Sequence, residues 1–170
     1  QAFNYAAEPF FFKNASQEGG STTVYAQIAR AFALVGSLAF LGIMLYLDLI
    51  QFFLGRDFRT GLGVVPILLI AYLFLGLFYN FSIWYKLADR TLFGGYIALG
   101  GSVITLGLNF LLIPNPAISY FGPAWAALAC YVFMALTSYW TGQRYYPIAY
   151  PLRRILTYVG SAVAVYLASI

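Results

Sequence analysis

The ionisable side chains limit the chemistry that this chain can perform. The sequence holds nine Lys and Arg residues, five Asp and Glu residues and no histidine. Without histidine, a His-based triad, an imidazole proton relay and the usual zinc sites are excluded. The carboxylates form no close pair in sequence for acid/base work, and the glycine-rich stretches "GLGVV" and "LGGSV" lack the Lys-Ser/Thr of a phosphate-binding loop. We therefore expect no enzyme, no catalytic residues and no metal site.

The composition explains why ionisable residues are so few. Hydrophobic residues make up 62% of the chain and charged residues 8%, against about 25% charged residues in a soluble domain. Uncharged runs longer than about 18 residues recur along the sequence, which is typical of transmembrane helices. The sequence therefore predicts an all-α, polytopic transmembrane bundle. Its one cysteine, Cys130, has no partner for an internal disulfide and is expected to be a small core residue.

The uncharged runs define the predicted spans. Residues 31–47 and 61–85 carry no charge, and at a rise of about 1.5 Å per residue each can cross a core of about 30 Å, the first with help from its flanks. Pro66 either kinks the second of these helices or stands in its first turn. The longer uncharged run 91–143 is divided by "IPNPAISYFGP", whose Pro and Gly residues break helical geometry. We predict five complete spans after the end of an earlier one at 1–12; they are 24–54, 61–88, 92–113, 122–143 and 152–170.

The basic residues predict the orientation of these spans. One face carries seven of them: Lys13, Arg30, Lys86, Arg90, Arg144, Arg153 and Arg154. The other face carries only Arg56 and Arg59, so the positive-inside bias favours a cytoplasmic position for the first face. Aromatic pairs at 84–85, 139–140 and 145–146 mark the same boundary. The net charge of +4 is then a topology signal that attracts anionic membrane lipid, and it requires no nucleic-acid partner.

Polar residues inside the predicted spans are costly in hydrocarbon and are therefore candidates for function. Tyr72, Gly76 and Asn80 follow each other at steps of four, and a similar stripe of small and polar residues in the next span ends at Asn109. Such stripes also serve close helix packing, but Asn80 lies deep enough to need a hydrogen-bond partner. Arg30 and Asp48 are about 27 Å apart along one helix, so each either reaches the interface or meets a partner at its own end.

Three stretches resemble the C-terminal half of the bacterial polysaccharide flippases, as found in Bacteroidetes-type sequences. These flippases belong to the multidrug/oligosaccharidyl-lipid/polysaccharide exporter superfamily. The stretches are "QAFNYAAEPFFFKNA" (1–15), "GVVPILLIAYLFLGLFYNFSIWYKLADRT" (63–91) and "LNFLLIPNPAISYFGPAWAALACY" (108–131). The combination of AAEPFFF with NFSIWYK is the more specific signal, and the hairpin in the third stretch is a general feature of the superfamily.

The resemblance implies part of a two-lobed transporter in the bacterial inner (cytoplasmic) membrane that opens alternately to its two sides. It implies that the N-terminal lobe and the last span lie outside this chain. The substrate would be a polyprenyl-pyrophosphate-linked oligosaccharide, moved from the inner to the outer leaflet. A pyrophosphate favours cationic partners, which makes Arg30 and Lys86 candidates, and Tyr72, Asn80 and Asn109 are candidates for contact with the sugar.

The carboxylates suggest a gate or an ion site within such a transporter. Glu8, next to Pro9 near the cytoplasmic end of its span, can pair with Arg30 or Lys86 to close an inner gate, or bind a coupling cation, Na⁺ or H⁺. Asp48 is a second candidate for such a role. Glu8 can equally be a helix-end carboxylate that reaches headgroup water. We expect no cofactor beyond the coupling cation.

Two other functions remain open on the sequence. A multidrug exporter of the same superfamily shares this architecture, but we expect acidic residues deep in its cavity, and the middle of these spans is uncharged. A non-transporting membrane scaffold would not need Asn80 or aligned polar stripes.

Overall fold

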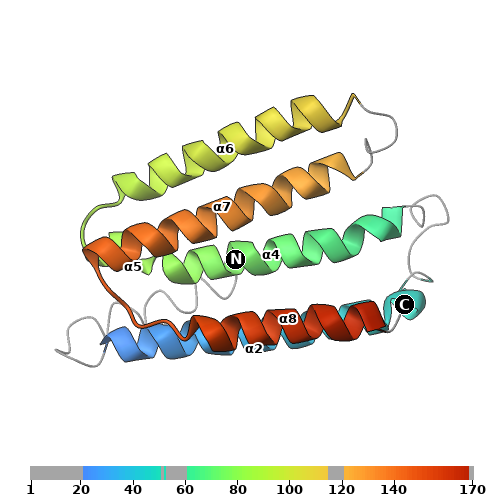
Figure 1. Cartoon of the computed structure of the whole chain (residues 1–170), viewed down its shortest axis with the longest axis horizontal. Helices are drawn as coiled ribbons and strands as arrows, with labels where there is room; N and C mark the ends of the chain where they lie inside the picture. Colours follow the sequence, from blue (N-terminus) through green and yellow to red (C-terminus); the bar gives the residue numbers. More distant parts are fainter. Residues whose placement is uncertain (1–20, 51, 53–60, 115–120, 169–170) are drawn as a thin grey trace.

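A computed structural model describes residues 21–50, 52, 61–114 and 121–168 of the chain (Figure 1). The described residues form helices and their connections, with no strand among them, which confirms the all-α prediction. The helices are α2 (Ser21–Leu45), α3 (Leu47–Ile50), α4 (Val65–Phe81), α5 (Ile83–Leu87), α6 (Leu92–Leu112), α7 (Gly122–Tyr145) and α8 (Leu152–Ala168). The preceding predicted span, 1–12, lies outside the described residues.

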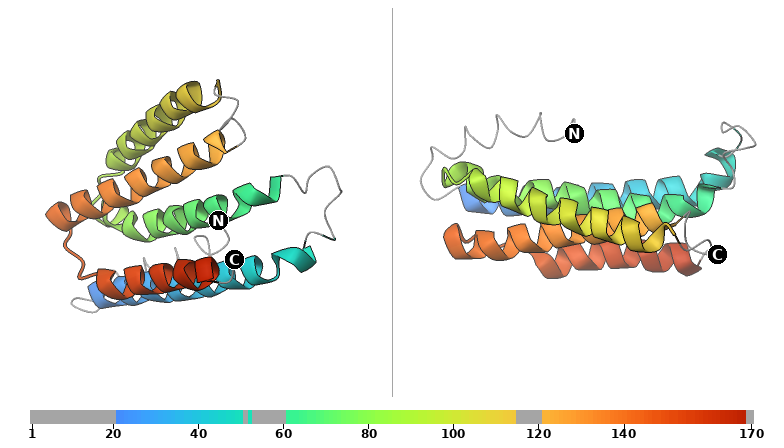
Figure 2. Two further views of the ribbon diagram at one scale, coloured as in Figure 1. Left: turned by 45° about the vertical axis from the view of Figure 1, so that its right-hand side comes forward. Right: turned by 90° about the horizontal axis from the view of Figure 1, so that it is seen from above.

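The long helices run alternately in opposite directions and pack side by side (Figure 1). α7 packs between α6 and α4, and α2 packs between α4 and α8. Seen from above, α7 and α8 lie on one side of the bundle and α2 and α4 on the other (Figure 2). α7 and α8 follow each other in the chain, but they pack against each other far less than α6 and α7 do.

Three helical segments are long and apolar enough to cross a membrane, namely Thr22–Leu45, Gly61–Leu87 and Leu92–Leu112. They indicate a membrane protein. Of the other two predicted spans, α8 has 17 residues, somewhat fewer than the about 20 needed for a perpendicular crossing. α7 has 24 residues, but its proline, hydroxyl, amide and arginine side chains make it less apolar than the other three.

Prolines stand where two helices begin. Pro66 lies in the first turn of α4 and Pro123 in the first turn of α7, where the missing backbone N–H has no intrahelical partner to lose. Pro66 therefore starts its helix and does not kink it. α6 ends at Leu112, just before Pro114, so the proline-rich stretch separates two antiparallel helices.

Two of the predicted helical segments contain a break. Within 24–54, a turn at Tyr46 separates α2 from α3, and within 61–88, a turn at Ser82 separates α4 from α5. At the second break, Ser82 Oγ donates to the Tyr79 carbonyl oxygen at 2.8 Å. A hydroxyl that bonds back to the preceding turn competes with the backbone ladder and bends helices.

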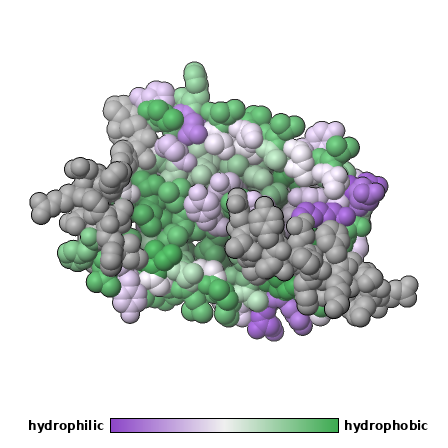
Figure 3. Space-filling view, turned by 180° about the vertical axis from the view of Figure 1, so that it is seen from behind, coloured by the Kyte–Doolittle hydropathy of each residue, from purple (hydrophilic) through white to green (hydrophobic). Residues whose placement is uncertain are grey.

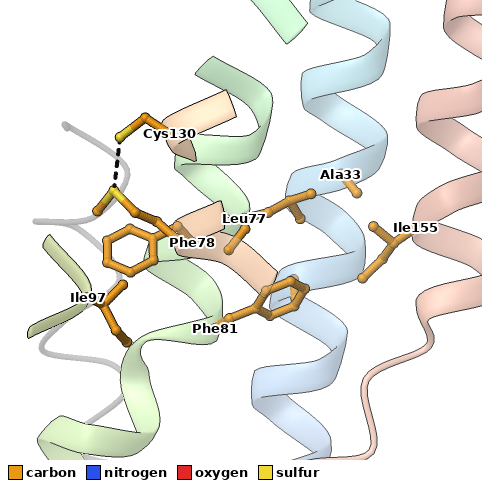
Figure 4. Packing of buried hydrophobic residues seen from close by; sticks show 10 residues of the cluster. Ala33, Leu77, Phe78, Phe81, Ile97, Cys130 and Ile155 are labelled. Carbon is orange, nitrogen blue, oxygen red and sulfur yellow. Dashed lines mark hydrogen bonds between the residues drawn. The ribbon is translucent and has the colours of Figure 1, made fainter. Parts of the chain in front are cut away.

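One apolar core contacts all five long helices (Figure 4). Phe78 of α4 points toward Ile97 and Cys130, whereas Leu77 and Phe81 lie on the side of Ala33 and Ile155 (Figure 4). The core packs tightly because small residues stand at the contacts, and a Cβ added at Gly76 would lie 1.9 Å from the Phe32 ring. Gly76, a member of the α4 stripe, thus allows the close approach of α2.

Large apolar side chains also cover the surface. Phe110 and Leu92 of α6 are 82% and 74% exposed, and α6 buries only Ile97 and Gly101. Figure 3 shows apolar residues over much of one face, with hydrophilic residues mainly toward its edges. An apolar exterior is what a bilayer solvates, in agreement with the membrane-capable helices.

Candidate functional site

One end of the bundle collects the basic side chains. The first turns of α2, α6 and α8 and the last turns of α5 and α7 meet there (Figure 1). We call it the cationic end; it carries Lys86, Arg90, Arg144, Arg153 and Arg154. Among the described residues, the opposite end has no Lys or Arg. Five of the seven basic residues predicted for one face thus lie at one end; Arg30 lies farther along α2, and Lys13, Arg56 and Arg59 lie outside the described residues.

A buried polar network lies beside the break between α4 and α5 at this end. Asn80 is 5% exposed, and its Nδ2 donates to the Gly76 carbonyl oxygen at 2.9 Å. The Tyr150 hydroxyl, on the connection to α8, donates to the Asn80 carbonyl oxygen at 3.3 Å. Since a buried carbonyl without a partner is costly, this bond stabilises the broken turn.

Ser138 connects the same break to α7. Its Oγ is fully buried, donates to the Phe81 carbonyl oxygen at 3.1 Å and accepts from Trp84 Nε1 at 3.4 Å. Phe81 is the last residue of α4, so its carbonyl is one that the helix leaves unpaired. Ser138 was not predicted from the sequence. The signal that could have found it is the one that identified Asn80, a polar side chain inside a predicted membrane span.

An aromatic cluster surrounds this network. Trp84 is 1% exposed and stacks on Tyr145, with ring centroids 5.6 Å apart and planes 12° from parallel. Phe93 packs edge-on against Trp84. The Arg90 guanidinium lies over the outer part of the cluster, 4.5 Å from the Tyr145 ring centroid. Rings with an apolar body and a polar tip, next to a cation, are typical of the headgroup layer.

Tyr150 adds a neutral hydroxyl to the cationic end. Its ring packs against Phe81 and Tyr139, with centroids 4.8 Å and 6.2 Å away. Burial, and to a smaller extent the nearby Tyr25 and Tyr139, raise the pKa of the Tyr150 phenol above its ordinary value. The group is therefore a hydrogen-bond donor across the physiological pH range.

The residues predicted for substrate contact divide between the two ends. Asn80 and Lys86 lie at the cationic end, on α4 and α5. Arg30 is half-buried on α2 and lines a surface hollow of about 350 Å³. Tyr72 is 58% exposed and contacts the Tyr131 ring at 6.1 Å between centroids, about 12 Å from Asn80 along α4.

The other predicted residues do not join the cationic end. Asn109 lies in the last turn of α6 at the opposite end, and its buried Oδ1 has no hydrogen-bond partner among the described residues. Asp48 lies in α3, also at that end. Glu8 lies outside the described residues. Of the candidates, Asn80 and Lys86 thus lie at the same end of the bundle, six residues apart in sequence.

The cationic end exposes the guanidinium groups of Arg90, Arg144, Arg153 and Arg154, and behind them lie the buried amide of Asn80 and the buried hydroxyl of Ser138. Cations suit a phosphate or pyrophosphate, and aromatic faces with hydroxyl or amide groups suit a sugar. In the part of the chain that the structure describes, no three His, Cys, Asp or Glu side chains gather where they could hold a metal ion.

Comparison of the chain with protein-family models, with curated proteins and with solved structures finds no match in any of the three.

Proposed function

We propose that this chain is part of a multi-pass transporter that moves a lipid-linked oligosaccharide across the bacterial inner membrane. The observation that carries the proposal is the broken helix α4–α5, with the buried amide of Asn80 beside the break and basic residues at the same end of the bundle. Membrane transporters commonly use discontinuous helices at their binding sites, because interrupted backbone there can serve a ligand or a moving gate. The flippase-like stretches of the sequence supply the substrate class.

The proposed mechanism assigns the pyrophosphate and the sugar to different groups. Lys86, in the last turn of α5, and Arg30, about 14 Å along α2 from its first residue, attract the pyrophosphate as the substrate enters from the inner leaflet. The rings and hydroxyls near Asn80 contact the sugar, while the polyprenyl tail stays in the bilayer. Tyr72 and Asn109, which lie farther from this end, would meet the headgroup later in its passage.

The proposed topology has five crossings, with the cationic end in the cytoplasm. It is supported by the alternating direction of the five long helices (Figure 1). A helix of the length of α7, 24 residues, spans about 36 Å, enough for a bilayer core of about 30 Å. α8, with 17 residues, spans about 25 Å and needs its flanking residues or a locally thinner bilayer.

The transport cycle needs parts beyond the described residues. The missing N-terminal lobe would close the other side of the cavity. Glu8 would pair with Arg30 or Lys86 in the closed inner gate or hold the coupling cation, Na⁺ or H⁺, and Asp48 is the second carboxylate for this role.

A leaflet assay tests the proposal. The gene that encodes this chain is deleted in its host, and lipid-linked glycan is measured on each leaflet, then again after the wild-type gene or a variant is returned. We expect inner-leaflet accumulation in the deletion, rescue by the wild type, and reduced rescue by Asn80→Ala. Ser102→Ala is the matched control, because Ser102 is exposed on α6 and bonds only to its own helix. An unchanged leaflet distribution in the deletion strain would reject the flippase function.

A further inference from the structure

A narrow apolar groove runs between α4, α7 and α8. Its volume is about 170 Å³, and its walls include Phe74 and Leu77 of α4, Leu136 and Trp140 of α7, and Leu152 and Leu156 of α8. Leu136, Trp140 and Leu156 are 49%, 71% and 63% exposed, so the groove opens on the outside of the bundle. Figure 1 shows that α7 and α8 border this face, with α4 between them.

The size of the groove limits what can fill it. The groove is small, about 170 Å³, and its walls are the apolar and aromatic side chains of three helices. An acyl chain has no side chains and is thin enough to lie inside, against the apolar walls.

Two arginines continue the walls of the groove at the cationic end. Arg144 follows Trp140 by four residues on α7, and Arg153 precedes Leu156 by three residues on α8, so each shares a helix face with a residue of the groove. Both arginines are exposed. The amino end of α8 adds the partial positive charge of its unpaired N–H groups, and no acidic residue in its first turn offsets that charge.

Little negative charge balances this region. Among the described residues of the cationic end, Asp89 is the acidic one; it is exposed, in the turn between α5 and α6. α6 packs on the side of α7 that faces away from α8. An apolar groove beside two exposed arginines, with Asp89 as the acidic residue described at this end, is complementary to a molecule with an apolar chain and an anionic head.

We propose that an anionic glycerophospholipid of the bilayer occupies this groove. One acyl chain lies along Leu77 and Leu136, the Trp140 indole lies at the level of the glycerol, and the phosphate lies between Arg144 and Arg153. This site depends on the chain being embedded in a membrane, not on its being a flippase. It faces outward from the bundle, so a bound lipid would hold α8 against α4 and α7.

Native mass spectrometry of the purified protein tests the charge of the ligand. The protein in detergent is titrated with phosphatidylglycerol and with phosphatidylcholine that carry the same acyl chains. Each Arg near an anionic headgroup strengthens binding about fivefold. With two arginines, we expect phosphatidylglycerol to bind about 25-fold more tightly than phosphatidylcholine. Arg153→Gln should weaken phosphatidylglycerol binding about fivefold and weaken phosphatidylcholine binding less, because the choline of that lipid already balances its phosphate. Arg153→Lys, which keeps the charge at the same position, is the matched control and should retain phosphatidylglycerol binding.

A second pair of variants tests the groove itself. Leu156→Trp, at the mouth, should weaken binding of both lipids, whereas Leu106→Trp, at an exposed position of α6 (71% exposed), should not. The proposal is overturned if Arg153→Gln binds phosphatidylglycerol as tightly as Arg153→Lys does, or if Leu156→Trp leaves both affinities unchanged. Binding of a polyprenyl phosphate without binding of phosphatidylglycerol would also overturn it. Each result is obtained without a transport assay, so failure of the flippase function would not be mistaken for failure of this site.

Discussion

At the scale of single residues, the cationic end depends on small side chains that leave room for Trp84. Gly142 of α7 is buried, and a Cβ added there would lie 2.7 Å from Cδ1 of the Trp84 indole. Trp84 is held on its other sides by Ser138, Tyr145 and Phe93. The ring therefore has little freedom to move away, and the glycine is required for the contact between α5 and α7.

We predict that Gly142→Ala destabilises the protein by about 1–2 kcal/mol, because overpacking outweighs the gain in helix propensity. Thermal unfolding in detergent measures the change. Gly107→Ala is the control: nothing lies within 4 Å of its added Cβ, so the propensity gain of up to about 1 kcal/mol should appear alone. Equal transition temperatures for the two variants would show that Trp84 is loosely held.

The Tyr150 phenol makes stability depend on alkaline pH. Burial raises its pKa in the folded protein, so above the unfolded pKa of about 10 the folded state keeps a proton that the unfolded chain loses. The contribution is complete below that pH and is lost as pH rises, by up to about 1.4 kcal/mol per pH unit. Unfolding by denaturant between about pH 9 and pH 12 should show a shallower decline for Tyr150→Phe than for the wild type. Tyr96→Phe, which removes the hydroxyl of an exposed ring, should keep the wild-type slope.

At the scale of elements, the connection between α5 and α6 is a tight helix end in which one residue other than glycine has a left-handed backbone conformation. The Arg90 N–H donates to the Tyr85 carbonyl oxygen at 2.7 Å and the Ala88 N–H to the Trp84 carbonyl oxygen at 2.8 Å. Between them Asp89 has φ of 52°, the left-handed conformation that glycine usually supplies at such ends. Aspartate tolerates it better than most residues, and this turn sets the direction in which α6 leaves the cationic end.

Two substitutions at Asp89 separate backbone conformation from charge. Asp89→Val and Asp89→Gly both remove the carboxylate, but a β-branched residue in the left-handed region costs about 1–2 kcal/mol, whereas glycine adopts it freely. We expect Asp89→Val to lower the unfolding temperature in detergent and Asp89→Gly to leave it unchanged or raise it. If both variants lose the same stability, the carboxylate is what the turn requires.

At the scale of the whole molecule, the segregation of charge predicts a fixed orientation in the membrane. Cys130 is the one cysteine of the chain and is buried, so a Cys130→Ala background allows single cysteines to be placed at either end. Arg90→Cys and Arg154→Cys lie at the cationic end, and Phe52→Cys lies beyond α3, at the other.

An impermeant thiol reagent should label Phe52→Cys in intact spheroplasts, and label Arg90→Cys and Arg154→Cys only in inverted vesicles. Labelling of the Arg90 and Arg154 positions from opposite sides would contradict the proposed topology, because α6 and α7 lie between them and two crossings return the chain to the same side. Labelling of all three positions from one side would mean that the described bundle is not inserted across the membrane.

The sequence predicted correctly those properties that depend on residues close together in the chain. The helical class, the break at the proline-rich stretch and the gathering of Lys and Arg on one face follow from local composition. The break at Ser82 was missed because no proline or glycine marks it; at the break a hydroxyl bonds to the backbone three residues earlier. Asn80 was correctly identified as buried and hydrogen-bonded, whereas its partners, Gly76 in its own helix and the Tyr150 hydroxyl 70 residues later, were not identified.

The sequence by itself determined that this is a helical protein with membrane-capable segments and an uneven distribution of charge, because hydrocarbon tolerates only paired backbone and few charges. Only the tertiary structure decided which helices are neighbours. Helices that are apolar on all sides have no stripe of apolar residues that marks the buried face. The packing of α7 between α4 and α6 could therefore not be predicted from the sequence. The bond from Trp84 to Ser138, which joins residues 54 positions apart, and the groove between α4, α7 and α8 both depend on that arrangement.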